Sequence, residues 1–183
     1  MNNLNGLYIV TEGEFNKNLV EMLIPEQYQD KVSVLATNGY SDALSLTRSL
    51  LSARHQSNTI LVVDANSTND DNIEERKDFI TSYMNRVSGN DRFAILLQKP
   101  AIEVAFFEDK TALETLTGKG YTDLEFRLAK DNPKKNFLDF LSINIGDKKD
   151  VLDRVSADEK LKKELRGSQL SRMLSKAIQR FLN

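Results

Sequence analysis

Two short segments made only of large apolar and aromatic residues constrain the fold of this chain more than any other feature. Residues 7–10 are Leu-Tyr-Ile-Val, and residues 60–63 are Ile-Leu-Val-Val. Strands with one face in water alternate apolar and polar side chains, whereas continuous apolar runs of this length are typical of strands buried on both faces of a parallel sheet. We therefore expect these segments to form two adjacent strands in the middle of such a sheet.

The first hundred residues follow a regular rhythm of short strands and longer helices. The predicted strands cover residues 6–11, 32–36, 59–64 and 93–97. The segments between them carry apolar side chains at three- and four-residue spacing, as amphipathic helices do, and Ser41 or Asp42 is expected to cap the second helix. This alternation predicts an α/β fold with about four mainly parallel strands, flanked by helices and joined by right-handed crossovers.

The rhythm changes after Pro100, where the sequence predicts a mostly helical second half. Short helices are expected around Glu103, over 121–130 and 135–142, and around Val151, followed by a strongly amphipathic helix at the end of the chain. We therefore expect an α/β core over 1–108 and a helical extension over 109–183 that packs on it within one structural domain. Arg172, Lys176 and Arg180 form a basic stripe on the last helix. This stripe fits a solvated face or a contact with nucleic acid or protein.

Composition limits both the location of the protein and the metals it can bind. No apolar run approaches the roughly 20 residues that cross a bilayer, and residues 1–5 lack the pattern of a signal peptide, so we expect a cytoplasmic protein without membrane contact. The chain has no cysteine and one histidine, His55, which is expected to complement the dipole at a helix end. Any metal ion must therefore be held mainly by oxygen ligands.

Acidic and amide side chains stand where the predicted strands end. Glu12 follows the first strand, Asp64 ends the third and is followed by Asn66, and Glu103 comes shortly after the fourth. The carboxyl ends of parallel strands meet at one sheet edge, which is where ligands bind in open α/β sheets. Clustered carboxylates repel each other, and a hard cation such as Mg²⁺ or Mn²⁺ would offset that repulsion. We therefore predict a metal site formed by Glu12 and Asp64.

Three motifs in this order resemble those of Toprim domains. Residues 10–17 (Val-Thr-Glu-Gly-Glu-Phe-Asn-Lys) resemble the glutamate motif of that superfamily, 38–41 its glycine loop, and 62–66 (Val-Val-Asp-Ala-Asn) its Asp-x-Asp motif. Residues 99–107, which include Glu103, resemble a segment of small stand-alone relatives of the overcoming-lysogenization-defect nucleases. Asn66 stands where the family usually has a second aspartate. Its amide oxygen can ligate a metal but brings no negative charge, so weaker Mg²⁺ binding is expected.

The resemblance implies Mg²⁺-dependent cleavage of DNA or RNA, in phage defence or DNA metabolism, with an ATPase or another protein as a possible partner. Glu12 and Asp64 would hold the metal, and Glu103 would complete its shell or act as a base. Lys99 would neutralise charge on the phosphate. The backbone amides of Gly39 to Ser41, at a helix N-terminus, would bind a phosphate oxygen.

Two other interpretations use the same residues. In the first, the Toprim-like site is degenerate because of Asn66, and the chain is a binding or regulatory module that acts on a protein partner through its helical half. In the second, the chain is a receiver-like domain in which Asp64 is phosphorylated, Glu12 and Glu14 hold Mg²⁺, and Lys99 contacts the phosphate.

Overall fold

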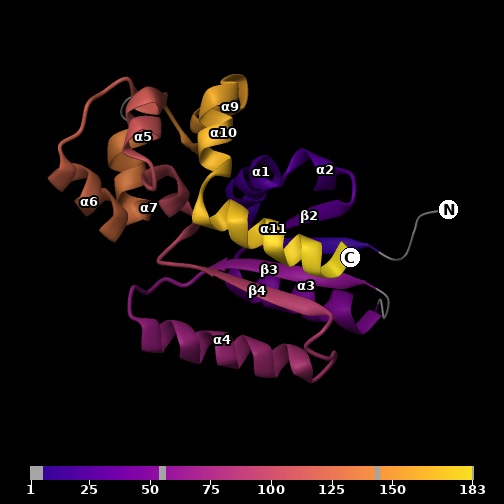
Figure 1. The fold of residues 1–183 in the computed structure, drawn as a ribbon. Helices are drawn as coiled ribbons and strands as arrows, with labels where there is room; N and C mark the ends of the chain where they lie inside the picture. The colour runs from indigo at the N-terminus through magenta and orange to yellow at the C-terminus, as the bar shows by residue number, and fades with distance from the viewer. Residues whose placement is uncertain (1–5, 54–56, 143–144, 183) are drawn as a thin grey trace.

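A computed structural model, which describes residues 6–53, 57–142 and 145–182, has an α/β fold built on a four-stranded, all-parallel sheet (Figure 1). His55 lies outside the described residues. The strands are β1 (Leu7–Glu12), β2 (Val32–Thr37), β3 (Asn58–Asp64) and β4 (Phe93–Gln98), in the order β2-β1-β3-β4. All four predicted strands are present, and the two continuous apolar segments form the central pair β1 and β3, as expected.

Helices cover both faces of the sheet (Figure 1). The helices α3 (Tyr40–Ala53) and α4 (Asp70–Asn85) pack on one face, and α1 (Gly13–Leu23) and α11 (Gln169–Leu182) pack on the other. Successive residues of the central strands serve opposite faces: Ile60 and Val62 belong to the core under α1 and α11, whereas Leu61 and Val63 belong to the core under α3 and α4. Burial on both faces explains why these strands have no polar alternation.

The start of α3 differs from the sequence prediction. We expected Ser41 or Asp42 as its cap, but the helix begins at Tyr40, so both residues lie in its first turn. The Gly39 carbonyl accepts a hydrogen bond from the Ala43 amide at 3.0 Å, and this bond closes the first turn of the helix before the expected caps. Gly39 has a φ of +123°, which residues with a β-carbon rarely adopt, and this lets the chain turn sharply from β2 into the helix.

The second half of the chain is helical, as predicted. Its elements are η1, a 3₁₀ helix (Ile102–Phe107), α5 (Lys110–Thr117), α6 (Asp123–Asp131), α7 (Pro133–Asn136), η2, a π-helix (Phe137–Ser142), α9 (Lys148–Ala157), α10 (Glu159–Arg166) and α11. A short α2 (Glu26–Gln29) precedes β2 in the first half. In the described ranges, no helix is both long enough and apolar enough to cross a bilayer.

Elements η1 to η2 form a lobe beyond the carboxyl ends of the strands (Figure 1). The rings of Phe15 on α1, Phe106 on η1 and Phe137 on η2 pack together, and the Phe106 and Phe137 ring centres lie 5.2 Å apart with edge-to-face geometry. These aromatic contacts tie the lobe to the first helix of the α/β core. The lobe thereby covers the sheet edge at which Glu12 and Asp64 lie.

Candidate functional site

The strand order creates a natural place for a ligand between β1 and β3. From β1 the chain moves outward to β2 on one side, then returns across β1 to build β3 and β4 on the other side. In open α/β sheets the point where the strand order reverses leaves a crevice beyond the carboxyl ends, and ligands bind there. Glu12 and Asp64 are the last residues of these two strands, so the structure brings the two predicted carboxylates to this position.

A direct hydrogen bond links the two acids. The Asp64 amide donates to Oε1 of Glu12 at 3.1 Å. Asp64 itself is buried, and its Oδ1 accepts a hydrogen bond from the Ile102 amide at the start of η1, at 2.9 Å. Glu12 is only half-buried. The position of Asp64 is therefore fixed by the fold, whereas Glu12 keeps access to solvent.

Lys134, which sequence analysis did not select, supplies a positive charge to this site. Its ammonium lies 2.7 Å from Oδ2 of Asp64 and donates a hydrogen bond of 2.9 Å to Oδ1 of Asn66. The lysine lies on α7, whose N-terminus is capped by the side chain of Asn132. A single ammonium thus bridges two of the three oxygen donors that the sequence analysis assigned to a metal ion.

The backbone after β3 places Asn66 for this contact. Asn66 has a φ of +54°, in the left-handed region that asparagine tolerates better than most residues. Its amide donates to the Pro100 carbonyl at 2.8 Å, and the preceding amide, of Ala65, donates to the Gln98 carbonyl at 2.8 Å. These two bonds anchor the loop to the end of β4, so the Asn66 side chain is directed toward α7.

The electrostatics of the site show the cost of placing two acids together. Burial raises the pKa of Glu12, and the negative charge of Asp64 raises it further. The hydrogen bond from the Asp64 amide and the positive charges of Lys134 and Arg76 act in the opposite direction, but the pKa of Glu12 stays above its ordinary value. Glu12 is therefore more easily protonated than an exposed glutamate.

Lys134 responds in the complementary way. Partial burial alone would lower its pKa, but the hydrogen bond to Asp64 and the negative charges of Asp64, Glu103 and Glu12 outweigh that effect and raise the pKa. The ammonium therefore stays charged at neutral pH and interacts electrostatically with all three acids of the site.

Glu103 lies in η1 with a side chain only 2% exposed, and it has a lysine of its own. The Lys148 ammonium is 2.7 Å from its Oε1 and also lies 4.5 Å from the ring centre of Phe15. The second oxygen, Oε2, is buried and has no hydrogen-bond partner in the described part of the chain. A buried carboxylate oxygen without a partner is costly, so this atom is available to a further donor or cation.

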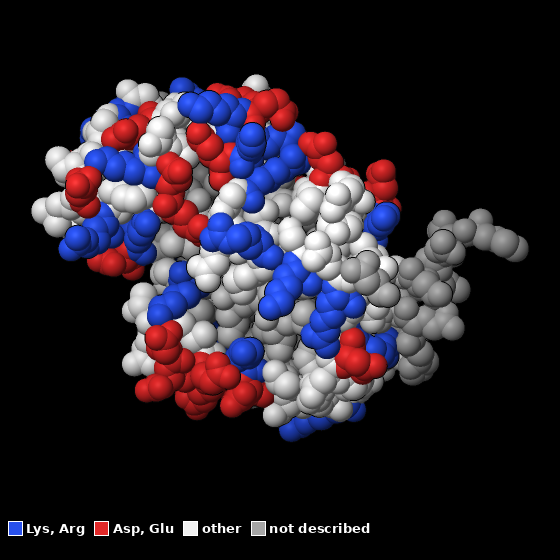
Figure 2. Space-filling model, viewed as in Figure 1, with Lys and Arg blue, Asp and Glu red and all other residues white. Residues whose placement is uncertain are grey.

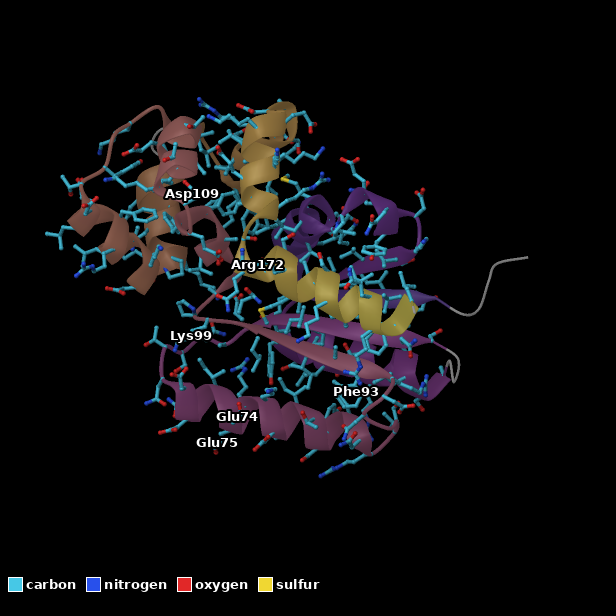
Figure 3. The ribbon with its side chains drawn as sticks, viewed as in Figure 1. Glu74, Glu75, Phe93, Lys99, Asp109 and Arg172 are labelled. Atoms are coloured by element: carbon cyan, nitrogen blue, oxygen red, sulfur yellow. The ribbon has the colours of Figure 1, made fainter. Side chains whose placement is uncertain are left out.

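The other predicted residues lie at the same edge but have different partners. Lys99 forms an ion pair of 2.6 Å with Asp70, at the start of α4, and Figure 3 shows it near the N-terminal part of that helix. The lysine that contacts Asp64 and Asn66 is Lys134. The predicted role of Lys99 beside a phosphate stays a prediction. Gly39 and Ser41 lie at the N-terminus of α3, directly after β2. Their predicted role in phosphate binding stays a prediction.

The sequence contained only a weak signal for the two lysines that reach the acids. Lys134 stands in the run Asn-Pro-Lys-Lys-Asn, and Lys148 stands in Asp-Lys-Lys-Asp, both of which resemble ordinary solvated helix starts. Both Lys134 and Lys135 are exposed, and the packing of the lobe against the sheet edge brings Lys134 to Asp64 and Asn66.

The oxygen atoms of the site suit a hard cation, although Lys134 and Lys148 already form ion pairs with two of the acids. Glu12, Asp64 and Asn66 offer only oxygen atoms, and Oε2 of Glu103 is buried without a partner. No cluster of three or more acidic or histidine side chains with the spacing of a metal site occurs within residues 6–53, 57–142 and 145–182. A divalent ion would therefore share Asp64 with Lys134 or displace its ammonium.

In comparisons with known proteins, no family model, curated protein or solved structure matches this chain.

Proposed function

We propose that this chain is a Mg²⁺-dependent, Toprim-like nuclease that cleaves phosphodiester bonds of DNA or RNA. The observation that carries the proposal is the convergence of Glu12, Asp64, Asn66 and Lys134 beyond the ends of β1 and β3, where strand order reverses. Acids that occupy such a crevice, with one pKa raised by burial, are typical of functional sites because they bring no benefit to stability.

Each residue has a role that follows from its contacts. Glu12, Asp64 and the Asn66 amide oxygen would hold the metal, with Glu103 as a further oxygen donor. A bound Mg²⁺ supplies Lewis acidity and lowers the pKa of a water molecule. The Lys134 ammonium, held between Asp64 and Asn66, is placed to neutralise a phosphate oxygen, the role that the sequence analysis gave to Lys99.

The test is cleavage of single-stranded and double-stranded DNA and RNA by the purified protein with Mg²⁺ or Mn²⁺. We expect cleavage in the wild type and a loss of at least about 100-fold in Glu12→Gln and Asp64→Asn, the size typical of an essential acid–base group. Glu14→Gln is the matched control because Glu14 is exposed and lies two residues from Glu12. Equal cleavage by the wild type and both site variants would contradict the proposal.

A second candidate function is a binding or regulatory module with a degenerate metal site. The observation in its favour is that Lys134 holds two of the three expected metal ligands, one of which is the uncharged Asn66. Calorimetry with Mn²⁺ distinguishes the two functions. If the wild type does not bind Mn²⁺ whereas Asn66→Asp or Lys134→Met does, the degenerate site is favoured, and a protein partner of the helical half becomes the next target.

A further inference from the structure

A surface hollow adjoins the carboxylate site on the side of α3 and α4. It has a volume of about 460 Å³, and its lining includes Tyr40, Asn66, Ser67 and Phe79. Because Asn66 also contacts Lys134, the hollow lies next to the atoms that would act on a phosphodiester. A nucleotide chain held at the carboxylate site therefore has a neighbouring space for one of its bases.

An exposed aromatic ring forms one wall of this hollow. Phe79 is 59% exposed, although large apolar side chains are normally buried. Its ring stacks on Tyr83, one turn further along α4, with ring centres 6.3 Å apart and planes inclined by 12°. The guanidinium of Arg48 lies 4.7 Å from the centre of the Tyr83 ring. Arg48, Tyr83 and Phe79 thus form a stack of planar groups that ends at the hollow.

A second planar pair lines the hollow closer to the acids. The guanidinium of Arg76 lies 4.0 Å from the ring centre of Tyr40. Burial raises the pKa of Tyr40, and the positive charge of Arg76 opposes that rise, as it does for Glu12. The Nε of Arg76 is buried and has no hydrogen-bond partner within the described ranges. The hollow therefore combines flat apolar surfaces with a guanidinium donor that is not fully used.

We propose that this hollow binds an unpaired nucleobase of a single-stranded nucleic acid, which stacks on Phe79 and extends the planar series. The ligand class rests on the proposed function, since the phosphodiester would lie at Lys134. Charge also favours a base over a phosphate here: Glu75 lines the hollow, and Figure 2 shows acidic side chains gathered over the N-terminal part of α4. A base is uncharged, and every base has a flat face for stacking, so this subsite is tolerant of sequence.

The test measures binding without cleavage. Fluorescence anisotropy in buffer with EDTA gives the dissociation constants of labelled single-stranded DNA and RNA oligonucleotides for the wild type and its variants. We expect Phe79→Ala and Phe79→Leu to weaken binding at least about fivefold, and Phe79→Trp to retain it, because stacking needs a flat ring. Leu128→Ala is the control, since Leu128 on α6 is 53% exposed and truncation there removes a comparable apolar surface.

An oligonucleotide with abasic sites isolates the base. The wild type should bind it as weakly as Phe79→Ala binds the intact oligonucleotide, and Phe79→Ala should not distinguish the two. Equal affinity of the wild type and Phe79→Ala for the intact strand, equal binding of a blunt duplex, or no binding would each overturn the inference. If cleavage depends on Glu12 and Asp64 but binding ignores Phe79, only this inference fails. If binding depends on Phe79 but no cleavage occurs, only the proposed nuclease activity fails.

Discussion

At the scale of single residues, the ammonium of Lys134 connects the site, because it contacts both Asp64 and Asn66. Asp64 has a side chain only 5% exposed, and its charge is balanced by a lysine that is itself 48% exposed. Removing a charged partner from a buried group leaves that group without compensation, which costs more than the loss of a surface ion pair. The partial exposure of Lys134 reduces that cost, because water can approach the pair.

Lys134→Met should therefore lower the free energy of unfolding by about 1–3 kcal/mol at neutral pH. Urea denaturation measures this change. Lys135→Met, a neighbouring exposed lysine, is the control and should change stability by less than about 0.5 kcal/mol. Adding Asp64→Asn to Lys134→Met should restore part of the loss, because the buried charge is then gone. A double variant that is less stable than the sum of both single variants would contradict this account.

Glu12 gives the site a predictable pH dependence. Its pKa in the folded protein lies above the ordinary value of 4.5, so between these two values the folded state binds more protons than the unfolded state. Stability then falls as pH rises through this window, and the full cost of the ionised Glu12 is present at neutral pH. Glu12→Gln, which keeps an oxygen for the Asp64 amide, should raise the melting temperature at neutral pH.

This gain should vanish as the pH falls below 4.5, where Glu12 is protonated in both states. Thermal unfolding followed by circular dichroism from about pH 4 to about pH 8 tests the slope. Glu14→Gln should not show this change in slope. A lower melting temperature for Glu12→Gln across the whole range would mean that the ionised Glu12 stabilises the fold through Lys134 and Arg76.

At the scale of elements, the sequence predicted what depends on local pattern. Strands β1 and β3 were evident because residues buried on both faces must be apolar, and α11 was evident because Leu170, Leu174 and Ile178 form one buried stripe. Helix α5 was not predicted, because Lys110–Thr117 has only Leu113, Leu116 and Thr117 buried. The positions of Glu12 and Asp64 followed from strand ends, which a sequence reveals directly.

The partners of those acids depend on tertiary contacts and were not predictable in the same way. Lys134 lies 70 residues after Asp64, and neither α7 nor η2 is long enough for a periodic pattern to indicate which face is buried. Lys99 was chosen because it directly follows β4, but the exposed Asp70 at the start of α4 is its partner. The position of a residue directly after a strand predicts that it lies at this edge of the sheet. Which lysine contacts Asp64 depends instead on how the lobe packs against that edge.

At the scale of the whole molecule, the two halves share one core. Leu170, Leu174 and Ile178 of α11 belong to the same apolar cluster as Ile60 and Val62 of β3. Figure 2 shows the outer face of α11 as a line of basic side chains, which is the solvated side of a helix whose opposite side covers the sheet. The boundary predicted near residue 108 therefore separates two patterns of sequence and not two independent cores.

A fragment of residues 1–108 should consequently fail to fold. It would expose the face of β1 and β3 that α11 covers, and it would leave Asp64 and Glu103 without Lys134 and Lys148. The full chain should unfold in one cooperative transition, whereas the fragment should show no cooperative melting by calorimetry or circular dichroism. A fragment that melts cooperatively would establish residues 1–108 as an autonomous domain.

The two lysines that reach the buried acids are covalently part of the chain, and this changes what the site requires from its surroundings. Their effective concentration is set by the fold and stays the same when the concentration of free divalent ions falls. The fold should thus tolerate a chelator, in contrast to proteins that need a metal to become structured. An incoming metal ion or phosphate must compete with the lysine ammonium groups for the acids. Binding of such a ligand is therefore coupled to the packing of the helical lobe on the sheet edge.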